Sequence, residues 1–153
     1  MMESWGFTYK TCAFTWGKLT PNALGKMTSL MAQHGPTLRF LEKLCHFGLG
    51  YWCHGNPELC LLGTRGHPKR VDKSVANLVL APRGEHSAKP PVVRDRIIQL
   101  MGDRPRVELF ARPPVPEGWK AMGNELDGNF DIRDALTWHL SELGLGNWHG
   151  FCK

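Results

Sequence analysis

The chain has 153 residues, of which 42% are hydrophobic, so it can bury a sizeable core and is expected to form one domain. Its net charge of +5 suits a polyanionic partner but equally fits a solvated basic face. No apolar run is long enough to cross a bilayer, and an odd number of cysteines without an export signal predicts free thiols in the reducing cytoplasm.

The first half of the chain contains two predicted strands and one predicted helix. Alternating apolar residues predict a strand over Thr8–Trp16. Leu19–Pro36 is rich in proline and glycine, and we expect a long loop with one helical turn at most. Leucines at helical spacing predict a short helix over Thr37–Phe47, and the apolar segment Glu58–Leu62 predicts a strand.

The stretch Leu78–Gly128 is the most informative part of the sequence. An apolar run at its start precedes a charged loop, and apolar residues at helical spacing then follow Pro90 and Pro91, which suit a first helical turn. Arg106–Phe110 is expected to form a strand between two polar loops. In open α/β sheets, ligands bind beyond the carboxyl ends of strands, so these loops are candidates for a binding site. A further helix is expected over Asp131–Leu143.

The cysteines and histidines raise the question of a metal site. Tetrahedral zinc needs four Cys or His ligands, usually in close pairs such as C-x-x-C. Here the Cys-His pairs are adjacent residues, whose side chains diverge. Metal binding therefore remains only an alternative, and it would use Cys45, His46, Cys53, His54 and Cys60.

A series of short motifs gives the chain a family resemblance. In chain order they are Trp5-Gly6-Phe7, Trp16-Gly17-Lys18, Gly48–Trp52, Glu58–Gly63, Glu85–Pro90, Val107–Arg112, and Gly118-Trp119 with Gly123–Gly128. Each motif is weak by itself, but the ordered series resembles the adenine N(6)-methyltransferases of the messenger-RNA adenosine methylase type, which have bacterial and phage DNA members. The resemblance implies a Rossmann-like α/β fold over residues 1–128, incomplete at its N-terminus, followed by a C-terminal helix and tail over 129–153.

The resemblance also implies S-adenosyl-L-methionine as cofactor. Its carboxylate needs a cation, and Lys89 matches the family lysine in that role. The ribose hydroxyls need paired donors and acceptors, which Asn124 and Glu125 provide. Phe110 and Arg112 end the predicted strand and would also contact the cofactor, with Glu108 holding Arg112 from the same strand face. The alternatives are a solvated loop lysine and a weak surface ion pair.

Four further residues match family positions near the acceptor nucleotide in DNA or RNA. Lys18 and Glu58 would lie beside the adenine, and Tyr51 and Trp52 would help to shape the base pocket. The alternative is that Lys18 and Glu58 are solvated charges, with Trp16 in the core. The two aromatic residues of the glycine-rich segment would then cap a core as well.

The family's catalytic Asp-Pro-Pro-Trp motif does not occur in the sequence. In the family it precedes the Trp-Gly-Phe segment, so we expect it to belong before Met1 and assign no catalytic residue here. We also expect the chain to associate with itself or with a partner subunit. The alternative function is a non-catalytic, nucleic-acid-binding or partner subunit of the same fold.

Overall fold

The computed structural model describes residues 2–85 and 88–126. The chain divides into two compact units, Met1–Asp103 and Arg104–Lys153. Strands and helices both occur in the first unit, so the fold class is mixed α/β as expected. A short 3-10 helix, η1 (Glu3–Trp5), precedes the first strand.

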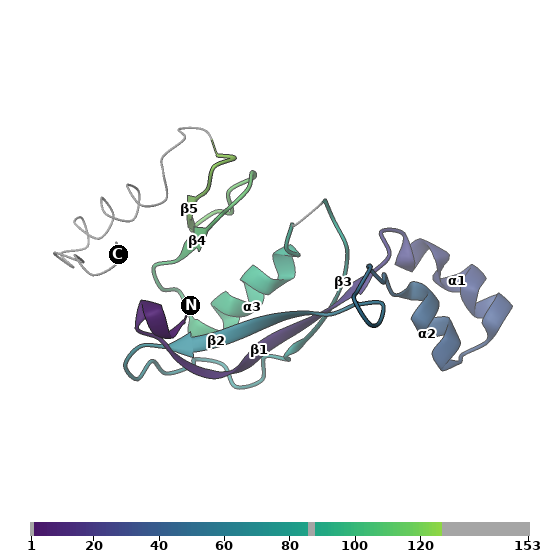
Figure 1. Cartoon of the computed structure of the whole chain (residues 1–153), viewed down its shortest axis with the longest axis horizontal. Coiled ribbons are helices and arrows are strands. Elements are labelled where there is room, and N and C mark those ends of the chain that lie inside the picture. Colours follow the sequence, from purple (N-terminus) through teal and green to yellow (C-terminus); the bar gives the residue numbers. More distant parts are fainter. Residues whose placement is uncertain (1, 86–87, 127–153) are drawn as a thin grey trace. The chain divides into compact units, whose positions relative to one another are not determined.

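The first unit is built on a three-stranded mixed sheet (Figure 1). Its central strand is β1 (Thr8–Leu19), which pairs antiparallel with β2 (Glu58–Thr64) and parallel with β3 (Leu78–Pro82). The strands predicted from alternation and apolar runs are therefore confirmed, and β1 continues three residues beyond the predicted end at Trp16.

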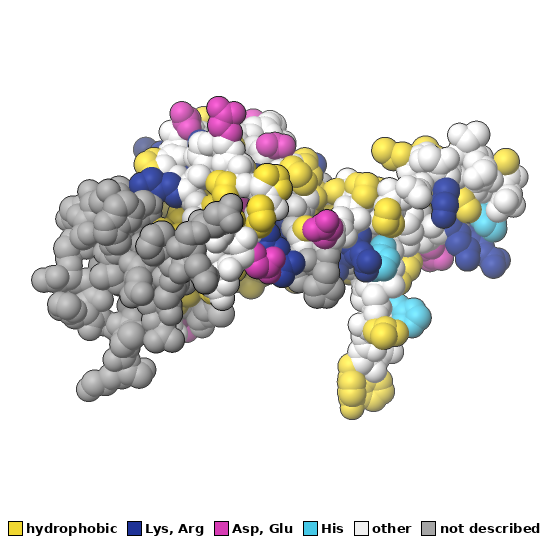
Figure 2. Space-filling model, turned by 90° about the horizontal axis from the view of Figure 1, so that it is seen from above, with side chains coloured by type: hydrophobic (Ala, Val, Ile, Leu, Met, Phe, Trp, Pro, Cys, Tyr) yellow, Lys and Arg dark blue, Asp and Glu magenta, His cyan; other side chains and the backbone are white. Residues whose placement is uncertain are grey.

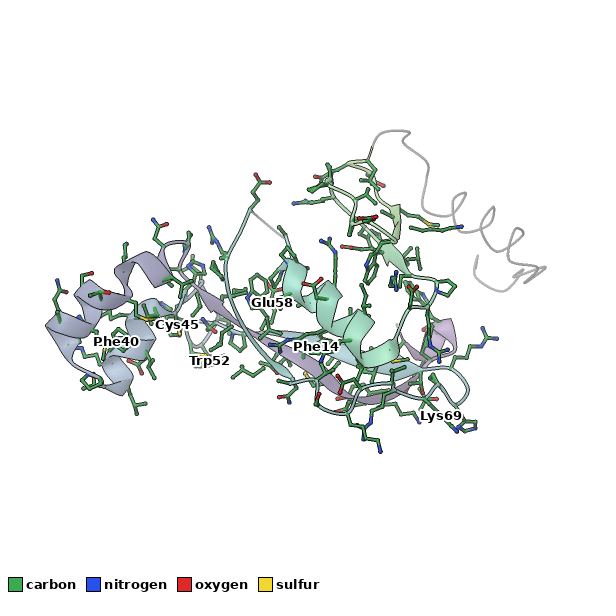
Figure 3. The ribbon with its side chains drawn as sticks, turned by 180° about the vertical axis from the view of Figure 1, so that it is seen from behind. Phe14, Phe40, Cys45, Trp52, Glu58 and Lys69 are labelled. Carbon is green, nitrogen blue, oxygen red and sulfur yellow. The ribbon has the colours of Figure 1, made fainter. Side chains whose placement is uncertain are left out.

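The main core lies between this sheet and one helix. Phe14 and Trp16 are 3% and 4% exposed because residues two apart in β1 face the same side. The helix α3 (Pro91–Met101) covers them with apolar residues at helical spacing, Val92, Val93, Ile97 and Leu100 (Figures 1 and 3). The predicted helix after the proline pair is thus confirmed, with Pro91 in its first turn.

The long loop expected over Leu19–Pro36 is wrong, because the structure has a twelve-residue helix there, α1 (Ala23–His34). Pro21 precedes the N-cap residue instead of interrupting the helix, and Gly35 ends it with a positive φ of 66°. Only Gly25 lies inside, and one internal glycine costs about 1 kcal/mol relative to alanine. Tertiary burial of Ala23 and Leu30 offsets that cost.

The second helix of this region, α2 (Leu38–Leu44), confirms the expected helix but ends three residues earlier. The Thr37 side chain caps it by accepting a hydrogen bond from the Phe40 backbone N–H at 3.3 Å. Phe40 and Leu44 pack with α1 in a second core cluster, separate from the one around Phe14 (Figure 3). Leu19 joins this cluster, so the end of β1 anchors the helical hairpin.

The second unit contains a two-stranded parallel sheet of β4 (Val107–Leu109) and β5 (Lys120–Met122). The predicted strand is confirmed and is shorter than expected. The pairing continues past β4, because the Ala111 backbone N–H donates to the Met122 carbonyl at 2.9 Å. The loops that follow the two strands therefore begin side by side.

The remaining expectations concern the C-terminus and membranes. The predicted helix over Asp131–Leu143 and the domain boundary after residue 128 lie outside the described residues. None of the helices in the described ranges is long and apolar enough to cross a membrane.

Candidate functional site

Three charged side chains that were predicted as site residues meet beside the sheet of the first unit. Glu58 begins β2 and pairs with Trp16 of β1, so Lys18 lies two residues further along the neighbouring strand. The Lys18 Nζ is 2.8 Å from Glu58 Oε1, and the Lys89 Nζ is 2.7 Å from Glu58 Oε2. The alternative placed Trp16 in the core, which is confirmed, and it left Lys18 and Glu58 solvated, whereas the structure pairs these two partly exposed charges with each other.

The neighbours of this cluster restrict how its side chains move. Lys18 Nζ lies 5.6 Å from the centre of the Trp16 ring, within the range of a cation–π contact. Trp16 itself belongs to the core, and its Nε1–H donates to the Ala81 carbonyl at 3.0 Å. The ring is thereby fixed, and it gives the lysine a rigid apolar support.

The two lysines keep Glu58 ionised. Hydrogen bonds from Lys18 and, second, from Lys89 hold the pKa of the Glu58 carboxyl below its ordinary value, against a smaller opposing effect of burial. A carboxylate that stays charged accepts hydrogen bonds only, so any further group that bonds to Glu58 itself must be a donor.

The lowered pKa predicts how stability depends on pH. Because the folded-state pKa is depressed, this carboxyl stabilises the fold fully above its unfolded-state pKa of about 4.3, and the contribution is lost as pH falls through the lower folded value. In urea titrations at about pH 6, Glu58→Gln should therefore have a lower free energy of unfolding than the unaltered protein. This difference between the two proteins should shrink as the pH falls to about 3. A gap that stays constant over this range would contradict the pairing.

Sequence reasoning missed Asn56, whose side chain hydrogen-bonds to the backbone of the cluster residue Lys18. Its Oδ1 accepts the Lys18 backbone N–H at 3.2 Å, and its Nδ2 donates to the carbonyls of Lys18 at 2.8 Å and His46 at 2.7 Å. One amide thus continues the pairing of β1 beyond β2 and ties it to the chain after α2. The only signal in the sequence was an asparagine two residues before Glu58.

The residues between His46 and Asn56 form a narrow loop, which we call the aromatic finger, Gly48–Gly55. Gly48 and Gly55 close it with two backbone hydrogen bonds of 2.8 and 3.1 Å. A Cβ on Gly50 would lie only 2.0 Å from the Cys53 carbonyl oxygen, so this turn requires glycine. Tyr51 and Trp52 are 95% and 92% exposed, and the alternative that they cap a core is therefore wrong.

The other predicted cofactor residues lie together in the second unit, on the loops after β4 and β5. Arg112 Nη2 is 2.8 Å from Glu125 Oε1, and Asn124 next to it is exposed. Phe110 is 72% exposed with a positive φ of 57°. Gly123 permits this approach, because a Cβ there would lie 2.2 Å from the Ala111 carbonyl oxygen. The contact between Arg112 and Glu108 stays a prediction.

Within the part of the chain that the structure describes, no three His, Cys, Asp or Glu side chains are grouped so that they could hold a metal ion. Cys45 instead donates to the Leu41 carbonyl, and burial raises the pKa of the Cys60 thiol. The zinc alternative therefore lacks a ligand cluster.

Comparison with known proteins shows that this chain is similar to methyltransferases. The family model MT-A70 matches residues 1–125. The chain belongs to the MT-A70 family, and its fold is that of the S-adenosylmethionine-dependent methyltransferases. The resemblance drawn from the motifs is thereby confirmed.

Individual relatives come from bacteria, animals and plants. The Type II methyltransferase M.MunI of Mycoplasma sp is 31% identical over 129 residues, which is 83% of this chain and 44% of that protein. The N(6)-adenosine-methyltransferase catalytic subunit METTL3 of Homo sapiens is 32% identical over 91 residues, 58% of this chain and 16% of that protein. An N(6)-adenosine-methyltransferase MT-A70-like protein of Arabidopsis thaliana is 32% identical over 99 residues, 63% of this chain and 14% of that protein. The chain thus spans less than half of each relative.

Proposed function

We propose that the chain takes part in transfer of a methyl group from S-adenosylmethionine to the exocyclic amine of adenine in DNA or RNA. The observation that carries the proposal is the cluster of Lys18, Glu58 and Lys89. It joins, through contacts of 2.8 and 2.7 Å, two residues expected at the acceptor and one expected at the cofactor. A methyl donor and its acceptor must meet at such a junction.

The donor groups of the chain fit S-adenosylmethionine. The ammonium of Lys89 has N–H donors besides the one that Glu58 occupies, and it is half exposed, so it can also bind the carboxylate of the cofactor. Asn124 and Glu125 offer a donor and an acceptor for the ribose hydroxyls, and Phe110 and Arg112 flank them. These loops follow parallel strands, the usual place for a ligand in a Rossmann-like sheet.

Glu58 is suited to the acceptor side. The exocyclic amine of adenine is a hydrogen-bond donor, and an ionised carboxylate has acceptor positions beyond those that Lys18 and Lys89 use. S-adenosylmethionine supplies a methyl group made electrophilic by its sulfonium. Glu58 and Lys18 orient the base, and Tyr51 and Trp52 contact the acceptor strand.

A second candidate function is a non-catalytic subunit of the same fold that binds nucleic acid. The observation that favours it is the pair of exposed aromatic residues Tyr51 and Trp52, which are 95% and 92% exposed and can contact a nucleic acid without taking part in methyl transfer. In either case the chain acts together with a second copy or a partner subunit. Cys12, Cys45, Cys53 and Cys60 are free thiols, which fits a protein of the bacterial or phage-infected cytoplasm.

Transfer of tritium from methyl-labelled S-adenosylmethionine to oligonucleotides separates the two functions. The methyltransferase should label single-stranded adenine-containing DNA or RNA, with N(6)-methyladenine as the product after digestion. Oligonucleotides whose adenines are already methylated at this nitrogen serve as the control and should stay unlabelled. Binding of the oligonucleotide without any labelling, with or without a partner subunit, would favour the binding subunit.

Lys89→Gln should weaken S-adenosylmethionine binding about 10-fold or more, since a hydrogen bond to a charged group contributes about 1.5–3 kcal/mol. Isothermal titration calorimetry measures the dissociation constant directly. Lys73→Gln is the matched control, because Lys73 is an exposed loop lysine of the same unit, and its variant should bind normally. Equal affinities for both variants would remove Lys89 from the cofactor site.

A further inference from the structure

The aromatic finger presents its large side chains almost wholly to solvent. Leu49 is 99% exposed, Tyr51 95% and Trp52 92%, although the loop that carries them is closed by backbone hydrogen bonds and a tight glycine turn. A closed turn holds these side chains on one short projection before any partner arrives. Large apolar surface in a defined geometry is typical of a binding surface.

The exposure of the rings limits which base they can hold. A residue that lines a pocket for an extruded adenine is partly covered by the other walls of that pocket. Tyr51 and Trp52 are 95% and 92% exposed, and among the described residues their ring contact is with each other. Rings this exposed suit a base beside the target adenine better than the adenine enclosed in its pocket.

The angle between the rings limits the form of the nucleic acid. The two ring planes stand at 87° with their centres 5.7 Å apart. In an intact duplex, neighbouring bases are parallel, so perpendicular rings cannot both stack in one undisturbed series of base pairs. An unpaired strand can turn one base onto Trp52 and pack the next against the edge of Tyr51.

The charges at the root of the finger favour nucleic acid over an apolar protein surface. Arg83 Nη1 lies 3.1 Å from His46 Nε2, and His46 in turn is held by Asn56. The same amide holds Lys18, so the root of the finger is continuous with the Lys18–Glu58–Lys89 cluster. Figure 2 shows a projection with hydrophobic side chains at its tip and Lys, Arg and His side chains near its root. Cationic side chains beside exposed aromatic rings are the usual arrangement in proteins that bind single-stranded nucleic acid.

We propose that the aromatic finger stacks on the unpaired bases that flank the target adenine, with Trp52 as the main platform and Leu49 beside it. The inference rests on the proposed function for the identity of the target. It goes further by assigning the finger to flanking bases instead of the methylated one, and to an unpaired strand instead of an intact duplex.

Fluorescence anisotropy with labelled single-stranded oligonucleotides containing one adenine tests the proposal. Trp52→Ala should weaken binding about 10-fold, because stacking of a base on an aromatic side chain contributes about that factor or more. Trp52→Phe should retain most of the affinity, and Leu49→Ala should lose part of it. Leu24→Ala is the matched control, since Leu24 is an exposed leucine of α1 outside the finger, and it should bind normally.

Abasic oligonucleotides identify which base the finger holds. Removing the base on one side of the adenine should weaken binding by the unaltered protein, and Trp52→Ala should then cause no further loss. If Trp52→Ala instead causes no further loss only when the adenine itself has been removed, the finger belongs to the acceptor pocket and the proposal is wrong. Tighter binding to the intact duplex than to the single strand would also overturn it.

The remaining outcomes separate the finger from the methyl transfer. If methyl transfer fails while the Trp52 and abasic results hold, the proposed function is wrong and the finger assignment stands. If Trp52→Ala binds oligonucleotides normally, or the unaltered chain binds none, the finger assignment is wrong. A lower molar mass of Trp52→Ala in light scattering, with unchanged oligonucleotide affinity, would show that a second copy occupies the finger.

Discussion

Replacing Glu58 with glutamine is expected to lower the rate of methyl transfer about 100-fold or more, the usual effect of removing a positioned polar group from a reacting centre. The reason is twofold. Glutamine has no negative charge to hold the ammonium groups of Lys18 and Lys89, which then repel each other. Its amide also replaces one acceptor oxygen by a donor, which cannot receive the adenine amine.

Single-turnover kinetics with labelled cofactor measures this effect apart from binding and product release. The loss should fall mainly on the rate of transfer, with a smaller effect on the affinity for the oligonucleotide. Glu42→Gln removes a carboxylate from the exposed side of α2 and should leave both quantities unchanged. A Glu58→Gln protein with normal single-turnover rates would exclude the carboxylate from the reacting centre.

Replacing Trp16 with alanine is expected to lower the free energy of unfolding by about 3–5 kcal/mol. The side chain is 4% exposed in the core of the first unit, and its removal also leaves the Ala81 carbonyl without the indole N–H. A domain of this size is stable by only about 5–15 kcal/mol, so the variant should unfold at much lower urea concentrations.

Urea denaturation at room temperature, followed by far-ultraviolet circular dichroism, gives the free energy of unfolding for this comparison. Trp5→Ala is the control, because Trp5 in η1 is 40% exposed and its removal should cost much less. Trp16→Phe keeps most of the apolar volume and should lie between the two. A Trp16→Ala protein whose free energy of unfolding stays within about 1 kcal/mol of the unaltered value would contradict burial of this ring in the core.

The sequence was most informative where a single period governs burial. Alternation in β1 and helical spacing in α3 identified both elements, because each buries one face against the same core. The helix α1 was missed because its proline and glycine residues were read as breakers. The prolines lie outside the helix, and its packing against Phe40 and Leu44 cannot be seen in local composition.

The candidate site was only partly predictable. Lys18, Glu58 and Lys89 were proposed from a family resemblance, yet nothing local in the sequence pairs them with one another. The register of β1 and β2 sets the contact between Lys18 and Glu58. The contact between Lys89 and Glu58 depends on the path of the chain between β3 and α3. Asn56 escaped prediction because its role depends on backbone groups of Lys18 and His46, which any residue type would provide.

The crystal structure of the chain with S-adenosylmethionine bound tests most directly whether Lys89, in its cluster with Glu58, holds the carboxylate of the cofactor. The expected result is a cofactor carboxylate within hydrogen-bond distance of the Lys89 Nζ. A bound cofactor whose carboxylate makes no contact with Lys89 would contradict the assignment.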